Sequence, residues 1–277
     1  MLVLGFLGPC GTHSEEAAMY INKVCGGKWQ LQPYQNIYET IYAVHEGKIA
    51  ACLVPIENSI EGTVRITLDT LAHDVDLKIN MELVWKIQHQ LLAKNNKRDF
   101  NKIISHPQAL AQCYKYIKKN YPCAKLIEAP STADAAATAA VNEKTAAIAS
   151  KRAGKLYRLN IIADNIQDVN NNVTRFVLLN KEQIDYAKGN TGKILLICQI
   201  DGAKAGSLCE VLMIFAKYNI NMTHIESRPA RTKLGNYIFF FEIETDMAGE
   251  KYLSEALQKI KQKCLWVKNL GTFSVLK

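Results

Sequence analysis

The sequence lacks long hydrophobic runs and an export signal. No eighteen consecutive residues are apolar, so we expect no membrane-spanning helix. The apolar start of the chain, MLVLGFLGPCG, has no basic segment and no Ala-x-Ala cleavage site. This pattern favours a buried strand over a signal peptide. We therefore expect a cytoplasmic protein that does not bind membranes.

Paired cysteines and nucleic-acid-binding patterns are also missing. The eight cysteines are scattered, without a Cys-x-x-Cys pair or a Cys/His ligand spacing, so we expect neither a metal site nor a disulfide framework. The net charge is +8, but the basic residues form no stripe with interleaved aromatic residues. We expect a solvated basic surface and no nucleic-acid binding. Such a surface would attract a small anionic substrate.

What the sequence does contain is four polar turns, each between an apolar strand and a helix. Their hydroxyl, amide and carboxylate groups are suited to bind a ligand, although each Ser or Thr is also suited to cap its helix. Thr12–Glu15 and Ser105–Gln108 have the spacing of a capping box. Ligands bind beyond the carboxyl ends of strands in open α/β sheets, so two facing α/β lobes would place all four turns around one cleft. The strands are expected at 2–7, 49–54, 102–104 and 125–127. The helices are expected at 15–24, 64–71 and 109–118, and an Ala-rich helix is expected after the turn 131–134, to about residue 141.

A fifth polar segment, residues 171–176, leads into the apolar strand 176–179. Thr174 supplies a hydroxyl group, and Arg175 supplies a guanidinium that can hold a carboxylate with two hydrogen bonds. A strand-end threonine beside a surface arginine is the alternative for this segment alone. We expect the strand to return to the first lobe, so that lobe 1 comprises about 1–79 and 160–181 and lobe 2 comprises about 80–159.

The pattern changes after residue 181. Residues 182–192 are polar, contain two glycines and are expected to form a linker. The remaining segment, 193–277, has the element order β-α-β-β-α-β of a ferredoxin-like fold and no catalytic constellation. We expect a regulatory module with strands at 193–200, 221–228, 237–245 and 265–275 and helices at 207–218 and 249–264.

Six motifs occur in a fixed order along nearly the whole chain. They are FLGPxGTxS at 6–14, VPIENSIEG at 54–62, SHPQALxQC at 105–113, STxxAA at 131–136, NxTRF at 172–176 and ESRP at 226–229. In these motifs the chain resembles prephenate dehydratase with a C-terminal ACT domain. The resemblance implies an α/β fold with a two-lobed catalytic domain over 1–181, similar to periplasmic-binding-protein lobes, and a ferredoxin-like ACT domain over 193–277.

The reaction implied by the resemblance converts prephenate to phenylpyruvate in L-phenylalanine biosynthesis. Carbon dioxide and water leave as the ring becomes aromatic, so no metal or organic cofactor is expected. A threonine hydroxyl is too weak an acid to give up its proton unaided, so we expect a hydrogen-bond donor or a relay completed by a buried Glu57 of raised pKa. The resemblance points to Thr174 for catalysis and to Asn58, Ser105 and Gln112 as substrate contacts. We also expect Arg175 and Glu57 to take part in catalysis, and further polar and apolar residues of the motifs to bind substrate: Ser59, Thr12, Ser14, Asn172 and Phe176.

One of these assignments also has a spacing argument. Gln112 lies seven residues after Ser105, which is two helical turns, so we expect both side chains to point into the cleft. His106, followed by Pro107, is expected to serve the start of a helix rather than to act as a base.

The resemblance also implies regulation and assembly through the ACT domain. L-Phenylalanine is expected to bind between paired modules and to give feedback inhibition, and the pairing makes a homodimer or a homotetramer. The family usually carries Pro-Gly-Ala-Leu before the first ACT helix, whereas this chain has Ala205-Gly206-Ser207-Leu208, a change that softens the turn. The implied effector residues are Gly206, Ser207, Leu208, Glu226, Ser227, Arg228 and Pro229.

Three questions stay open at this level. Arogenate dehydratase, whose substrate carries an amino group in place of the keto group, is an alternative within the same enzyme class. A non-catalytic amino-acid-binding protein could share the two-lobed plan. Finally, a helix N-terminus beside Cys10 is expected to lower the thiol pKa and to make Cys10 the most reactive cysteine, unless the thiol is shielded.

Overall fold

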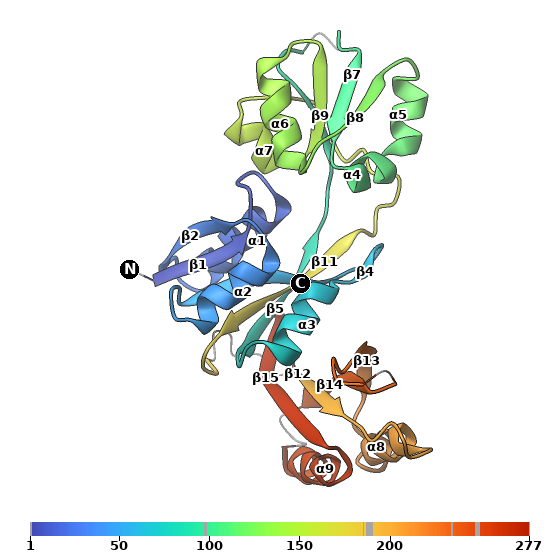
Figure 1. Cartoon of the computed structure of the whole chain (residues 1–277). Coiled ribbons are helices and arrows are strands. Elements are labelled where there is room, and N and C mark those ends of the chain that lie inside the picture. The colour runs from blue at the N-terminus through green and yellow to red at the C-terminus, as the bar shows by residue number, and fades with distance from the viewer. Residues whose placement is uncertain are drawn as a thin grey trace. The chain divides into compact units, whose positions relative to one another are not determined.

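The computed structural model describes residues 2–96, 99–184, 186, 191–233, 235–246 and 250–276 (Figure 1). Its contacts divide the chain into two compact units, each built from two segments. Unit 1 comprises Met1–Val64 and Val84–Phe176, and unit 2 comprises Arg65–Leu83 and Val177–Lys277. The expected boundaries at 181 and 193 remain a prediction, and residues 185 and 187–190 of the expected linker lie outside the described part.

The first part of unit 1 is a parallel sheet with helices between its strands. The central strand β1 is parallel to both β2 and β3, and the short β4 pairs antiparallel with β3. The helices begin where polar side chains cap them: Thr12 accepts a hydrogen bond from the Glu15 amide, and Asn36 from the Glu39 amide. The bounds are β1 Leu2–Leu7, α1 His13–Val24, β2 Trp29–Tyr34, α2 Ile37–His45, β3 Ala51–Asn58 and β4 Gly62–Thr63.

A second sheet in unit 1 has the strand order β10-β6-β9-β7-β8. Strand β7 is parallel to β8 and β9, whereas β6 is antiparallel to β9 and β10. The bounds are β6 Gln90–Ala93, β7 Lys102–Ser105, α4 Pro107–Gln112, α5 Tyr114–Asn120, β8 Lys125–Glu128, α6 Thr132–Val141, β9 Thr145–Ala149, α7 Lys151–Leu156 and β10 Asn160–Ala163.

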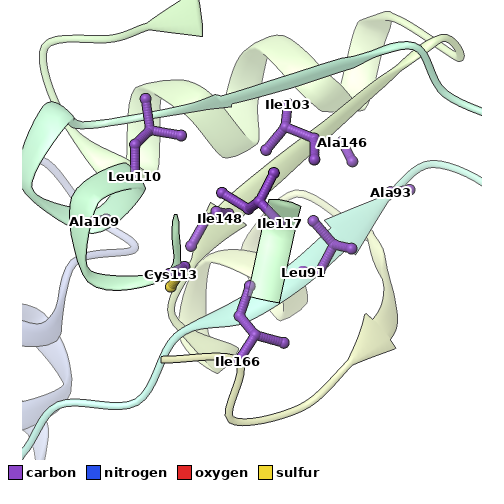
Figure 2. Close-up of a cluster of buried hydrophobic side chains, with 10 residues drawn as sticks. All are labelled: Leu91, Ala93, Ile103, Ala109, Leu110, Cys113, Ile117, Ala146, Ile148 and Ile166. Carbon is purple, nitrogen blue, oxygen red and sulfur yellow. The ribbon is translucent and has the colours of Figure 1, made fainter. Parts of the chain in front are cut away.

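This second sheet is buried on both faces. Successive residues of a strand point to opposite faces, so Leu91 belongs to one core cluster and Leu92 to the other. On one face Leu110, Cys113 and Ile117 pack against the strands, as Figure 2 shows. On the other face the alanines of α6 and Ala153 of α7 allow a close approach of these helices to the sheet.

Unit 2 contains the ferredoxin-like module. Its antiparallel strands have the order β13-β14-β12-β15, and β15 also pairs in parallel with β5. Side chains of α8 and α9, such as Phe215 and Ile260, pack on Leu196 and Phe241 of the sheet. The expected β-α-β-β-α-β order is confirmed. The bounds are α3 Arg65–His73, β5 Lys78–Lys86, β11 Val173–Asn180, β12 Thr191–Gln199, α8 Ser207–Lys217, β13 Met222–Pro229, β14 Tyr237–Asp246, α9 Glu250–Lys263 and β15 Trp266–Leu276.

Two expectations about local structure are wrong. The helix expected at 109–118 is two helices, α4 and α5, because Cys113 leaves the helical conformation between them. The strand expected to end at residue 54 continues to Asn58, so Glu57 and Asn58 belong to β3 and not to a turn. Among the described residues, no helix is both long enough and apolar enough to cross a bilayer.

Candidate functional site

A cavity of about 160 Å³ lies in unit 1, where the polar ends of several elements meet. Residues from three of the predicted strand-to-helix turns, from the end of β3 and from the start of β11 contribute to it, so the predicted convergence of these segments is confirmed. The lining residues are His13, Asn58, Ile87, His89, His106, Gln108, Ala109, Gln112, Thr132, Asn172 and Thr174. Of the predicted site residues, the cavity brings together Asn58, Gln112, Asn172 and Thr174.

The side-chain amide of Asn58 organises one wall of this cavity. Its Oδ1 accepts hydrogen bonds from the backbone N–H groups of Ile60 and Glu61, at 2.9 and 3.0 Å. Its Nδ2 therefore faces β11, where it donates to Asn172 Oδ1 and to Thr174 Oγ1, both at 2.9 Å. Because Thr174 Oγ1 accepts from Asn58, the hydroxyl proton of Thr174 is available to a partner in the cavity.

The hydrogen bonds between side-chain amides continue from Asn172 through Gln112 to a buried histidine, His89. Asn172 Nδ2 donates to Gln112 Oε1 at 2.9 Å, and His89 Nε2 lies 3.0 Å from the same oxygen. An amide oxygen only accepts, so Nε2 of His89 carries a proton. Burial, followed by the charge of His13, lowers the pKa of His89 to about 4 against the opposing effect of the Gln112 hydrogen bond. His89 is therefore neutral near pH 7.

Glu57 and Arg175 form an ion pair beside the cavity. Arg175 Nη1 donates to Glu57 Oε2 at 2.6 Å, and the two side chains are 17% and 30% exposed. From the sequence we hypothesised that a buried Glu57 completes a proton relay. In the structure this carboxylate is instead partly exposed and is bound by a guanidinium. Neither residue is among the described residues that line the cavity.

Four other predicted substrate-binding residues support the backbone around the cavity. Ser59 joins β3 to β11, because its Oγ donates to the Asn171 carbonyl and accepts from the Val173 N–H. Thr12 caps α1, Ser14 is buried in its first turn, and Phe176 is only 2% exposed in the core. In this geometry they position the lining residues, and their direct contact with a substrate stays a prediction.

The helical-spacing argument for Ser105 is wrong. Ser105 ends strand β7, is fully buried and donates its hydroxyl proton to the Ile148 carbonyl at 2.6 Å. The predicted capping box is also absent, because His106 caps α4 by accepting from the Gln108 N–H through Nδ1. The interpretation of His106 as part of the start of a helix is thereby confirmed. Ser105 is not among the described residues that line the cavity.

The expectation of a low thiol pKa at Cys10 is also wrong. Burial and the negative charge of Glu15 raise the pKa of Cys10, and Arg152 lowers it only in part. The Glu15 carboxylate accepts the Gly11 N–H at 2.6 Å and so places a negative charge at this turn. A raised pKa disfavours the thiolate and lowers the reactivity of Cys10.

The predicted effector residues lie in two segments of unit 2. Gly206 adopts a left-handed conformation, with φ of 81°, directly before α8, and Ser207 Oγ donates to the Lys204 carbonyl. Arg228 on β13 holds both carboxylate oxygens of Asp69 on α3, at 2.9 and 2.7 Å. Leu208 packs against the core of the module. Glu226, Ser227 and Pro229 accompany Arg228 on β13.

Several lining residues carry no sequence signal of their own. His13 stands at a variable position of its motif, and His89 precedes a strand that was not predicted from the sequence. Gln108 was singled out only as a capping residue and not as a lining residue. The described residues include no group of three or more His, Cys, Asp or Glu side chains placed to hold a metal ion.

Comparisons with known proteins agree with this arrangement. The prephenate dehydratase family model matches residues 4–184, and the ACT domain model matches residues 202–262. A prephenate dehydratase of Lactococcus lactis subsp. cremoris is 38% identical over 275 residues, which cover 98% of this chain and 97% of that protein. A prephenate dehydratase of Methanocaldococcus jannaschii is 36% identical over 268 residues, which cover 96% of each chain.

A solved structure extends the similarity to three dimensions. The prephenate dehydratase of Arthrobacter aurescens in complex with L-Phe superposes with a TM-score of 0.87 at 28% identity, covering 99% of this chain and 90% of that chain.

Proposed function

The chain belongs to the prephenate dehydratase family of hydro-lyases, and from that premise we propose that it converts prephenate to phenylpyruvate with release of carbon dioxide and water. The observation that supports this proposal most directly is the fixed orientation of the Asn58 side-chain amide. It accepts two backbone N–H groups and donates to Thr174 Oγ1 at 2.9 Å, so the Thr174 hydroxyl acts as a donor toward the cavity. A fixed donor at the position of a departing hydroxyl group stabilises the negative charge that develops there.

The remaining walls of the cavity suit a compact polar substrate. Gln108, Gln112, Asn172 and Thr132 present amide and hydroxyl groups, and Ile87 and Ala109 present apolar surface. This combination orients the polar groups of a ring-shaped substrate while it limits access of water. The substrate is then held so that loss of the carboxylate and loss of the ring hydroxyl coincide. We assign two roles to Arg175. Its ion pair with Glu57 supports β11, and its guanidinium supports a substrate carboxylate.

The proposal extends to regulation of the enzyme. We propose that L-phenylalanine, the product after transamination of phenylpyruvate, binds unit 2 near α8 and β13 and inhibits the enzyme. The L-Phe complex of the Arthrobacter aurescens relative and the intact Glu226–Pro229 segment support this assignment. The resemblance further supports a cytoplasmic homodimer or homotetramer that works in phenylalanine biosynthesis.

The first test is product formation by the purified protein. Prephenate is expected to yield equal amounts of phenylpyruvate and carbon dioxide, and L-phenylalanine is expected to lower the rate. Arogenate is the parallel substrate, and a higher kcat/KM on arogenate would replace prephenate in the proposal. Binding of both compounds without turnover of either would favour the non-catalytic binding protein.

A further inference from the structure

The reaction requires a proton that the assigned residues do not provide. Prephenate is a dianion, whereas phenylpyruvate is a monoanion formed together with carbon dioxide and water. One proton must therefore reach the departing hydroxide in each turnover. A threonine hydroxyl is too weak an acid to release this proton near neutral pH. The inference that follows rests on the proposed function and asks which group donates.

Histidines are the only titratable residues among the described residues that line the cavity. They are His13, His89 and His106, and no described lining residue is Lys, Arg, Asp, Glu, Cys or Tyr. Histidine is also the side chain whose ordinary pKa allows it to donate a proton near neutral pH. The proton donor inside the cavity is therefore sought among these three imidazoles.

Two of the three imidazoles are each engaged through one ring nitrogen in a hydrogen bond that supports the fold. His106 Nδ1 accepts the Gln108 N–H at 3.3 Å, so protonation of that nitrogen would remove the cap of α4. His89 uses its Nε2 proton to bind Gln112, and its buried surroundings disfavour the charged form. Each histidine thus has a defined structural task.

The hydrogen bonding of His13 differs from that of His89 and His106. Its Nδ1 lies 3.0 Å from Glu16 Oε2, and a carboxylate accepts, so Nδ1 carries a proton. The side chain is 13% exposed, and its buried Nε2 has no hydrogen-bond partner among the described residues. His13 is thus a cavity-lining imidazole with a carboxylate on one ring nitrogen and no hydrogen-bond partner for the other among the described residues, an arrangement suited to proton transfer.

The neighbours of this imidazole hold it in place. The ring of His13 meets the ring of His89 edge to face, with centroids 5.6 Å apart. Glu16 is itself fixed, because its Oε1 accepts the Arg152 N–H at 3.0 Å. The titratable and charged groups around His13 are thus Glu16 on its own helix, His89 before β6, and Arg152 on α7, whose guanidinium is paired with Glu15.

We propose that His13, in its imidazolium form, is the general acid of the dehydration, and that Glu16 orients its ring through the hydrogen bond to Nδ1. The C–O bond to the ring hydroxyl breaks with its electron pair, which takes the proton from His13 Nε2 and leaves as water. The C–C bond to the ring carboxylate breaks, releases carbon dioxide and leaves its electron pair in the aromatic ring. Thr174 donates a hydrogen bond to the same departing oxygen, and His13 regains a proton from solvent.

The test is the pH dependence of kcat for prephenate in the full-length protein. A general acid must be protonated, so wild-type kcat is expected to fall as rising pH removes the proton from the donating group in the substrate complex. His13→Phe, which retains an aromatic ring against His89, is expected to lower kcat by about 10²-fold or more and to abolish this falling limb. His45→Phe, at the end of α2 and outside the cavity lining, is the matched control and is expected to keep the wild-type profile.

A second variant, at residue 16, tests the proposal without a substitution at residue 13 that could impair folding. In Glu16→Gln the amide oxygen can still accept the Arg152 N–H, but its NH₂ group then faces His13 Nδ1 and favours the neutral imidazole. The falling limb is therefore expected to move to lower pH, with little change in kcat on its acidic side. A purely structural role for Glu16 would lower kcat at all pH values without moving the limb.

The outcomes separate the two proposals. An active wild type whose falling limb persists unchanged in both variants would overturn the assignment of His13 and leave the dehydratase proposal standing. A wild type that turns over neither prephenate nor arogenate would overturn the proposed function and the assignment with it.

Discussion

Replacement of Thr174 by alanine is expected to lower kcat for phenylpyruvate formation by about 10²–10³-fold, the usual effect of removing one fixed donor from a developing oxyanion. The KM for prephenate is expected to change little, because the hydroxyl acts mainly in the transition state. The fold should persist, since the Asn58 amide still donates to Asn172 Oδ1 and to the Val173 carbonyl. Steady-state kinetics and the thermal midpoint measure both effects.

A matched control for this variant is Thr138→Ala. Thr138 is exposed on α6, and its hydroxyl donates to the Asp134 carbonyl within the same helix. It does not belong to the described cavity lining, so wild-type kinetics are expected. A Thr174→Ala enzyme that retained most of its kcat would remove the central donor from the mechanism.

Asn58→Asp is expected to lower kcat by a similar factor although it changes few atoms. The introduced carboxylate still accepts the N–H groups of Ile60 and Glu61, so the end of β3 keeps its conformation. It cannot donate to Thr174 Oγ1. The threonine hydroxyl then donates to the carboxylate and is lost as a donor to the departing oxygen. The loss is therefore expected in kcat at neutral pH, within about 10²–10³-fold.

This variant also has a pH signature. A protonated carboxyl group can donate to Thr174 Oγ1 again, so the ratio of variant to wild-type kcat is expected to rise as pH falls through the pKa of the introduced group. Asn120→Asp, at the exposed end of α5, is the control for adding a carboxylate to unit 1. A pH-independent ratio, or an unchanged kcat, would show that the direction of the Asn58–Thr174 hydrogen bond is not important.

The general plan of the fold and four of the eleven described lining residues, Asn58, Gln112, Asn172 and Thr174, could be predicted from the sequence. Apolar strands followed by polar segments predicted the ligand-binding edge, and side chains from each of these polar segments line one cavity. Thr174 and Asn58 were identifiable because their hydroxyl and amide groups lie in motifs at strand ends. The β-α-β-β-α-β order was recognisable because strand and helix periodicities alternate clearly after residue 192.

What the sequence could not provide is the direction of individual side chains. Ser105 has the spacing of a ligand contact and of a cap, but the strand end turns its hydroxyl toward the Ile148 carbonyl. Cys10 lies before a helix, yet the neighbouring Glu15 and burial raise its thiol pKa. His13 and Glu16 are three residues apart on one helix, a common surface spacing, and only the fold shows that His13 is among the residues that line a cavity.

The Thr174 hydroxyl is the central group of the proposed dehydration, and one pair of variants isolates its contribution. Thr174→Ser keeps the hydroxyl, whereas Thr174→Val keeps the branched shape and removes the oxygen. We expect the kcat of Thr174→Ser for prephenate to remain within about 10-fold of wild type and that of Thr174→Val to fall as far as in Thr174→Ala, by about 10²–10³-fold. Equal kcat values for the serine and valine variants would contradict the claim that a hydroxyl donor at this position drives the dehydration.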